Sequence, residues 1–178
     1  MTDRERELEA ALETARAETR EAFANRALMH AHLFDVLEEE LGAEKAAALM
    51  KRAIYRRGLE IAERYRAAAA RSDLEEIGRL FVEGSASGGD IFEPSIEELD
   101  LENRRIILRM NACVHKDTWQ RAGYDTEQVD TLCDIASAVD FGTFEGAGLT
   151  LRFLDRQACA GSDRCLLELT VPAEGSDS

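Results

Sequence analysis

Positive charge is scarce in this 178-residue chain, which has 22 lysines and arginines against 36 aspartates and glutamates. The formal net charge is therefore -14 at pH 7. Proteins that bind phosphate backbones or anionic membrane faces do so through basic surfaces. The deficit argues against both kinds of partner, and we predict neither a nucleic acid nor a membrane partner.

The chain also has few features of a membrane or secreted protein. No apolar run approaches the roughly 20 residues that a spanning helix needs, and the N-terminus MTDRERELEA is charged from its third residue. Aromatic residues make up only 6% of the chain, which disfavours a pocket for a large organic cofactor. From these absences we predict a soluble, cytoplasmic protein.

The common catalytic and nucleotide-binding signatures are missing as well. The sequence contains no Gly-rich phosphate loop, no GxGxxG fingerprint, no nucleophile elbow, no C-x-x-C and no H-x-x-x-H. His30 and His32 are two residues apart, so on a helix they diverge by about 200° and cannot bind one metal from one face.

The first 71 residues contain no proline and only two glycines, Gly42 and Gly58. Alanine, leucine, glutamate and arginine dominate this part, and all four are strong helix formers. We expect a long helix over about residues 43–70, with Gly42 ending the helix before it. The N-terminal part of the chain is thus predicted to be helical throughout.

The sequence divides into three parts. Residues 1–24 are predicted to form a helical arm, residues 25–172 a single α+β domain, and residues 173–178 a disordered tail. The arm has only a thin apolar stripe, which suits contact with a partner better than burial in a core. We therefore predict a homo-oligomer formed through the N-terminal helices. The stripe consists of Leu8, Leu12, Ala15 and Phe23.

The glycine- and serine-rich stretch EGSASGGD (83–90) separates two patterns. After it, IFEPSIEELDL and RRIILRMNACV read as two strands joined by a tight turn. KDTWQRAG and TEQVDTLCDIASAVD read as two helices, the second capped by Asp125 or Thr126. The segment 148–171 reads as a second hairpin. The predicted fold class is α+β, with N-terminal helices followed by a ββααββ unit whose antiparallel sheet has about four strands.

The four cysteines all lie in the last 66 residues, and in a cytosolic protein we expect them to be reduced. If the strand over residues 104–114 continues to His115, alternation of side chains places Cys113 on its polar face, next to Arg109, Asn111 and His115. Such neighbours lower a thiol pKa and favour a reactive thiolate. The alternative is a partly exposed thiol at a strand end with no role.

The other thiols allow two interpretations. Cys133 and Cys165 fall among aliphatic residues, where a free cysteine usually acts as a small core residue. Alternatively, a thiolate-rich site could hold zinc. Its ligands would be Cys113, Cys133, Cys159 and Cys165.

Arginines on the polar face of the predicted sheet suggest how an anion might be held. Arg109 and Arg152 could bind a carboxylate ligand through bidentate pairing, with Asn111 beside them. The alternative is a solvated face on which the arginines pair with the many glutamates of the chain.

The chain resembles the L-2-amino-thiazoline-4-carboxylic acid hydrolase family over about residues 20–171. The resemblance lies in the helical block FANRALMHAHLFDVLEEELGAEKAAALMKRAIYRRGLEIAERY, in Cys113, and in the segments LCDIASAVD and CAGSDRCLLEL. In outline, the cysteine pattern is also similar to that of small-molecule-binding domains of the 4-vinyl-reductase type. Cys113, Cys133 and Cys165 match recurring cysteine positions of the family.

This resemblance implies a hydrolase that opens a small carboxylated cyclic amidine at a C–N bond. Cys113 would attack the amidine carbon and His115 would move protons, with Asp140 as a second acid or base. Arg109 or Arg152 would hold the substrate carboxylate, and a thiolate-bound zinc that activates water is the other route. The competing interpretation is a non-catalytic sensor or binding domain of the same fold that oligomerises through its N-terminal helices.

Overall fold

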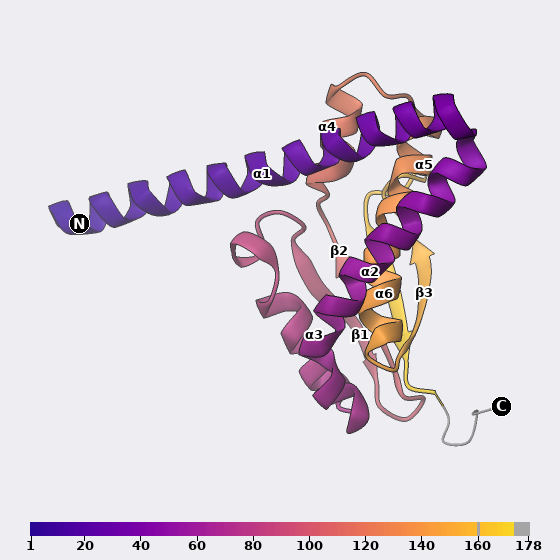
Figure 1. The fold of residues 1–178 in the computed structure, drawn as a ribbon. Helices are drawn as coiled ribbons and strands as arrows, with labels where there is room; N and C mark the ends of the chain where they lie inside the picture. The colour runs from indigo at the N-terminus through magenta and orange to yellow at the C-terminus, as the bar shows by residue number, and fades with distance from the viewer. Residues whose placement is uncertain (160, 173–178) are drawn as a thin grey trace.

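The computed structural model describes residues 1–159 and 161–172 and begins with two long helices (Figure 1). α1 spans Asp3–Leu41 and α2 spans Ala43–Ala70, so the predicted bounds of α2 are confirmed. The chain reverses at Gly42, whose φ of 82° lies in the left-handed region that favours glycine. The tail predicted for residues 173–178 lies outside the described residues.

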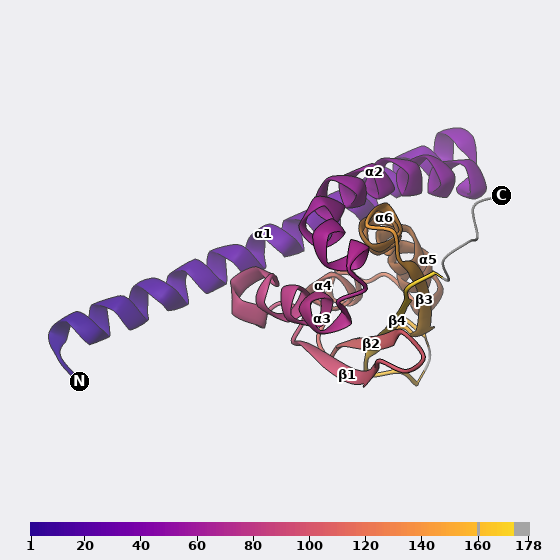
Figure 2. The same cartoon turned by 90° about the horizontal axis from the view of Figure 1, so that it is seen from below.

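α1 is one continuous helix that runs through the boundary expected at residue 24. It starts with a capping box in which the Thr2 side chain accepts a hydrogen bond from the Glu5 backbone N–H. Its C-terminal half buries Ala27, Ala31 and Phe34 in a core shared with α2, α4 and α5. Its N-terminal half projects away from the rest of the molecule (Figures 1 and 2).

After α2 the chain forms a short helix, a tight irregular segment and the first hairpin. α3 begins after Asp73, whose side chain accepts a hydrogen bond from the Glu76 N–H at 3.0 Å. These elements are α3 (Leu74–Glu83), η1 (Ala86–Gly89), β1 (Pro94–Asp100) and β2 (Arg105–Met110).

The four strands form one antiparallel sheet in the order β1-β2-β4-β3, which confirms the predicted α+β fold class. β3 spans Thr150–Asp155 and β4 spans Cys165–Thr170. Alternation places Ile106 and Leu108 of β2 on the core side, and both are fully buried. Figure 2 shows α2, α3 and α6 on one side of the sheet.

Three helices, rather than the expected two, connect the hairpins. They are α4 (Val114–Arg121), α5 (Thr126–Ala136) and α6 (Ala138–Gly146). Asp125 caps α5 in a capping box with Gln128, as one of the two predicted caps. The segment read as a single second helix breaks at Ser137, whose hydroxyl donates to the Asp134 carbonyl oxygen at 2.8 Å. This break turns α6 back against α2.

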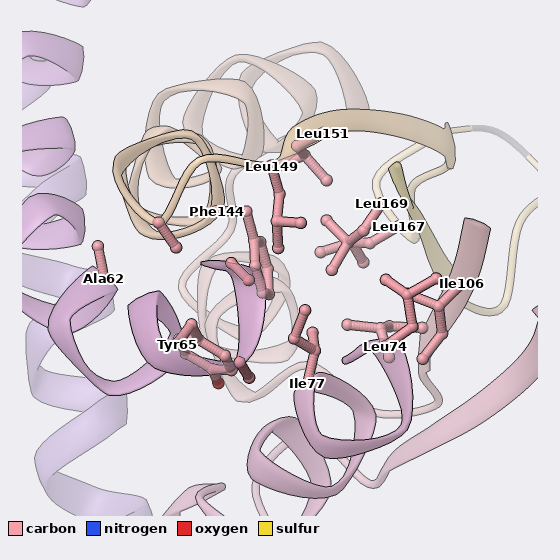
Figure 3. Close-up of a cluster of buried hydrophobic side chains, with 14 of the residues drawn as sticks. Ala62, Tyr65, Leu74, Ile77, Ile106, Phe144, Leu149, Leu151, Leu167 and Leu169 are labelled. Atoms are coloured by element: carbon pink, nitrogen blue, oxygen red, sulfur yellow. The ribbon is translucent and has the colours of Figure 1, made fainter. Parts of the chain in front are cut away.

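The main core lies between α2, α3, α6 and the sheet (Figure 3). Phe144 of α6 points into its centre and packs on Tyr65 of α2, with ring centroids 5.3 Å apart. Around them lie aliphatic side chains from α3 and from three strands. These include Leu74, Ile77, Ile106, Leu149, Leu151, Leu167 and Leu169.

α2 and α6 meet backbone to backbone, at Gly58 and Gly142. A Cβ atom added to Gly142 would lie 2.2 Å from the Tyr55 carbonyl oxygen, and one added to Gly58 would lie 2.3 Å from the Val139 oxygen. Two hydrogen bonds flank the crossing, from the Tyr55 hydroxyl to Glu145 at 3.1 Å and from Arg66 to the Gly146 carbonyl at 3.3 Å. Glycine at both positions permits this close approach.

Among the residues that the structure describes, no helix is both long and apolar enough to cross a membrane.

Substituting Gly142→Ala should destabilise the fold by about 2 kcal/mol, because the added methyl group meets backbone atoms that have no space to move into. This loss should outweigh the roughly 1 kcal/mol of helix propensity that alanine gains over glycine. Urea denaturation followed by circular dichroism measures the difference. Arg56→Ala, on the exposed side of α2, is the control and should stay within about 0.5 kcal/mol. An unchanged midpoint for Gly142→Ala would contradict the close contact.

Candidate functional site

Cys113 does not lie on a strand, which corrects the expectation that side-chain alternation places it on a polar sheet face. β2 ends at Met110, because the next two residues pair with the loop before β1 and leave the sheet. Asn111 N–H donates to the Glu93 carbonyl at 3.3 Å and Ala112 N–H to the Phe92 carbonyl at 3.1 Å. The chain then turns, and Cys113 becomes the N-cap of α4.

At this helix start the Cys113 sulfur accepts a hydrogen bond from the Lys116 backbone N–H at 3.4 Å. Such a bond favours the thiolate, as helix N-termini generally do. Burial acts in the opposite direction and is the larger effect, so the pKa of the half-buried Cys113 thiol is raised. The thiol is therefore protonated at neutral pH.

His115 lies in the first turn of α4, and its ring packs in an aromatic cluster. Its centroid lies 5.9 Å from that of Phe23, 5.8 Å from Phe92, 5.8 Å from Trp119 and 6.3 Å from His30. Within the described part of the chain, the buried Nε2 of His115 has no hydrogen-bond partner. The structure thus places this imidazole among aromatic rings from α1 and the loop before β1.

Burial lowers the pKa of His115 to about 4, and repulsion from His30 and Arg26 adds to this effect. Burial also lowers the pKa of His30, whose Nδ1 likewise has no hydrogen-bond partner among the described residues. Both imidazoles are therefore neutral at pH 7, and His115 cannot stabilise a thiolate at Cys113 by carrying positive charge.

Three thiols from three elements influence one another's ionisation. Burial, together with the smaller effect of negative charge at Cys165 and Cys113, raises the pKa of Cys133, on α5, to about 12. Burial raises the pKa of Cys165, at the start of β4, to about 11, opposed by a hydrogen bond of 3.3 Å from the Gln157 N–H. Cys159 differs, because it is exposed in the turn before β4. Cys113, Cys133 and Cys165 together are called the thiol cluster below.

The donors do not fit the zinc site that the sequence allowed. Among residues 1–159 and 161–172, no three histidine, cysteine, aspartate or glutamate side chains are grouped so that they could hold a metal ion. The raised pKa values of Cys133 and Cys165 also oppose the deprotonation that ligation requires.

Asp140, in the first turn of α6, has the most perturbed carboxyl group of the site. Asp140 is half-buried, and the partial removal of its carboxyl group from water raises its pKa to about 7. The negative charge of ionised Asp140 raises the pKa of two neighbouring groups, the Cys165 thiol and the buried Tyr65 hydroxyl. A carboxyl group with this pKa can both take up and release a proton near neutral pH.

The arginines predicted to hold a carboxylate lie on the outer face of the sheet, where they pair with the chain's own acids. Arg109 contacts Glu97 at 3.0 Å and the side-chain oxygen of Asn111 at 2.5 Å, and Arg152 contacts Glu168 at 2.8 Å. Asn111 in turn donates to the Glu93 carbonyl at 3.0 Å. This arrangement matches the alternative of a face whose arginines pair with glutamates.

Sequence reasoning missed a surface hollow of about 380 Å³ between α2 and α6. Ala138 and Phe141 line it, and these residues flank Asp140 in the chain. A second hollow, of about 480 Å³, lies at the α1–α2 turn. None of the residues predicted for the site lines either hollow. The first hollow could not have been found from sequence, since its two walls come from segments more than 80 residues apart. One wall consists of Lys51, Arg52 and Tyr55 on α2, and the other of Ala138, Phe141 and Glu145 on α6.

Alkylation should distinguish the four thiols. With iodoacetamide at pH 7.5, Cys159 should react first because it is exposed, and the thiol cluster should react slowly because its members are protonated and shielded. Peptide mass spectrometry over time gives the order. Cys159→Ser should remove the fast phase, and urea should make all remaining thiols reactive. Modification of Cys113 as fast as that of Cys159 would contradict the raised pKa.

Asp140→Asn should change the pH dependence of stability. The unfolded chain releases the Asp140 proton near pH 3.8 but the folded chain keeps it until about pH 7, so wild-type stability should fall as pH rises between these values. The isosteric amide does not titrate. The free energy of unfolding of the variant, measured relative to that of wild type, should therefore rise by about 2 to 4 kcal/mol between pH 4 and pH 8. Urea melts across this range provide the measurement, and a difference independent of pH would exclude a strongly raised pKa.

Comparison with known proteins identifies the family. The chain is similar in structure to the crystal structure of the phenol-responsive sensory domain of the transcription activator PoxR with phenol, with a TM-score of 0.48 and 16% sequence identity over 84% of this chain and 74% of that chain. A comparison with curated proteins gave no match. A family model described as L-2-amino-thiazoline-4-carboxylic acid hydrolase matches residues 20–168, which is most of the chain and confirms the resemblance read from the sequence. The chain belongs to the L-2-amino-thiazoline-4-carboxylic acid hydrolase family.

Proposed function

We propose that this protein hydrolyses a small carboxylated cyclic amidine, with Asp140 as the general acid–base group. The observation that carries the proposal is the half-buried Asp140 carboxyl group near Cys165, whose pKa is raised to about 7 by desolvation. Perturbed carboxyl groups of this kind are typical of catalytic acids and bases. Family membership supplies the substrate class, a 2-amino-thiazoline bearing a carboxylate.

Two steps suffice for the reaction. The substrate enters as the protonated amidinium, and ionised Asp140 takes a proton from a water molecule as its oxygen adds to the amidine carbon, which lies between the ring sulfur and nitrogen. The protonated carboxyl group then returns that proton to the leaving atom as its bond to this carbon breaks. The adduct hydroxyl becomes the carbonyl group, and its proton passes to the released amine or to water. A base with a pKa near the working pH serves both steps, and proton transfer of this kind typically contributes about 10² to 10⁴ in rate.

Direct attack by Cys113 is the less supported route. Its thiol has a raised pKa, and the neighbouring His115 has a pKa of about 4 and packs against aromatic rings. A nucleophilic cysteine normally needs an adjacent base or a lowered pKa. We therefore assign the chemistry to Asp140 and a place in its surroundings to Cys165, the one member of the thiol cluster whose pKa the Asp140 charge raises.

The bond that breaks determines the product. Cleavage of the bond between the amidine carbon and the ring nitrogen, which is the C–N cleavage expected from sequence, gives an S-carbamoyl cysteine with a free amine. Cleavage of the bond between the amidine carbon and the ring sulfur gives an N-carbamoyl cysteine with a free thiol. The position of Asp140 relative to the substrate decides which atom receives the proton, and a thiol reagent distinguishes the two products.

A second function is a binding module that holds a small ligand without turnover and oligomerises through its N-terminal helices. The observation that favours it is the set of raised thiol pKa values, which leaves the thiol cluster without an activated nucleophile. Under this function Asp140 would titrate on ligand binding, and no product would form.

Incubation of the purified protein with L-2-amino-thiazoline-4-carboxylate should release carbamoyl cysteine, detected by mass spectrometry. Asp140→Asn should lower kcat at least about 100-fold, because the amide cannot exchange protons. Cys113→Ser should retain most of the activity. Glu127→Gln, exposed on α5, is the matched control for loss of one carboxylate and should behave as wild type.

Three other outcomes of this assay would contradict the proposed function or its mechanism. Binding of the compound without turnover would replace the hydrolase with the binding module. Loss of activity in Cys113→Ser with retention in Asp140→Asn would instead assign catalysis to the thiol. Activity that requires added zinc and disappears with a chelator would restore the metal route.

A further inference from the structure

α1 carries an apolar seam that faces away from the body of the protein. Its residues recur at intervals of three, four or seven along the helix, which is the heptad spacing of a coiled coil. Five large members are strongly exposed, at 61% for Leu8, 52% for Leu12, 59% for Met29, 49% for Leu33 and 56% for Val36. The complete seam consists of Leu8, Leu12, Ala15, Ala22, Met29, Leu33 and Val36.

A different stripe of α1 already packs on the body. Ala27, Ala31 and Phe34 are buried there, and the Trp119 indole N–H of α4 donates to the Ala27 carbonyl oxygen at 2.7 Å. The seam lies on a different side of the helix from the buried stripe. Met29 and Leu33 are each two residues from the buried Ala31, which corresponds to a rotation of about 200° around the helix axis. The same helix segment thus has one stripe in the core and another in solvent.

The N-terminal half of α1 lacks the support that its C-terminal half has. Up to Glu18 all its residues are exposed, and Arg16 and Arg20 each bond to Asp90 of the body at 2.8 Å. Most of the stability of a helix in a protein comes from packing of one of its faces, which this segment lacks. A second surface along the seam would supply the missing burial.

We propose that two copies of this chain pair through α1 as an antiparallel coiled coil. An antiparallel pair brings the projecting half of each α1 onto the exposed seam of the other. Leu8 then lies opposite the partner's Leu33, and Leu12 opposite the partner's Met29. The two halves of one helix supply the two sides of the interface, so the seam is complementary to itself.

Charged residues in the seam and beside it favour an antiparallel over a parallel arrangement of the two helices. Position 26 completes the heptad pattern with an arginine, whose guanidinium lies 4.5 Å from the centre of the Phe23 ring. A parallel pair in register would bring two Arg26 side chains together in the seam, which is unfavourable for like charges. In the antiparallel register, Arg26 meets the small Ala15, and Arg4 on the flank meets the oppositely charged Glu39 of the second copy.

Sedimentation velocity of the full chain at micromolar concentration tests the pairing. Wild type should sediment as a dimer, and Leu12→Glu and Leu33→Glu should sediment as monomers with unchanged β-sheet signal in circular dichroism. Ala17→Glu adds the same charge on the opposite, exposed side of the arm and should remain dimeric. A monomeric wild type, or dimeric glutamate variants, would overturn the proposal.

Disulfide trapping in a Cys159→Ser background tests the direction. Mixing Leu8→Cys with Leu33→Cys should give a disulfide between the two different chains, whereas each variant alone should stay reduced. Efficient self-linking of Leu8→Cys alone would show a parallel pair and would overturn the antiparallel assignment. Neither experiment depends on hydrolase activity, so the pairing and the proposed function stand or fall separately.

Discussion

The backbone contact between Gly58 and Gly142 is the constraint on which the arrangement of the site depends. Because α6 touches α2 without intervening side chains, the short helix fits between α2 and the sheet. This placement sends Phe144 into the core and, on the preceding turn, holds Asp140 near Tyr65 and Cys165. A wider crossing would move the carboxyl group toward water, and its pKa would return toward the ordinary value.

Desolvation is the common cause of the unusual ionisation in this region. It raises the pKa of Asp140 and of the thiol cluster and lowers that of His115, so in each case the neutral form is favoured. The opposing contribution at Cys113, from the Lys116 and His115 backbone N–H groups at the start of α4, is too weak to reverse it. Of these groups, only Asp140 is brought close to neutral pH by burial, since a carboxyl group starts well below it. The same environment therefore keeps the thiols protonated at neutral pH and brings the pKa of the carboxyl group close to 7.

The regular parts of the fold could be predicted from sequence, whereas the end of β2 and the break between α5 and α6 could not. Alternation in RIILRM assigns the two faces of β2 correctly, and helix composition gives the bounds of α2. The error at Cys113 arises because strand length is decided by pairing with residues 92–93, which the alternating pattern does not show. His115 was likewise misassigned, since its neighbours Phe23 and His30 come from a helix some 90 residues earlier. Asp140 was named as a candidate, but its burial depends on α2 and has no local signal.

α1 links the site to the proposed pairing of two chains. Its inner stripe carries Phe23 and His30 against His115, two residues from the Cys113 cap, while its outer seam carries Met29 and Leu33. The inner contacts alone bury mainly alanines, so they hold the helix with little apolar area. In the proposed dimer, burial of the outer seam would add area on the other side of the same turns. The stability of the aromatic cluster beside Cys113 would then depend on a second chain that contributes no residue to the cluster itself.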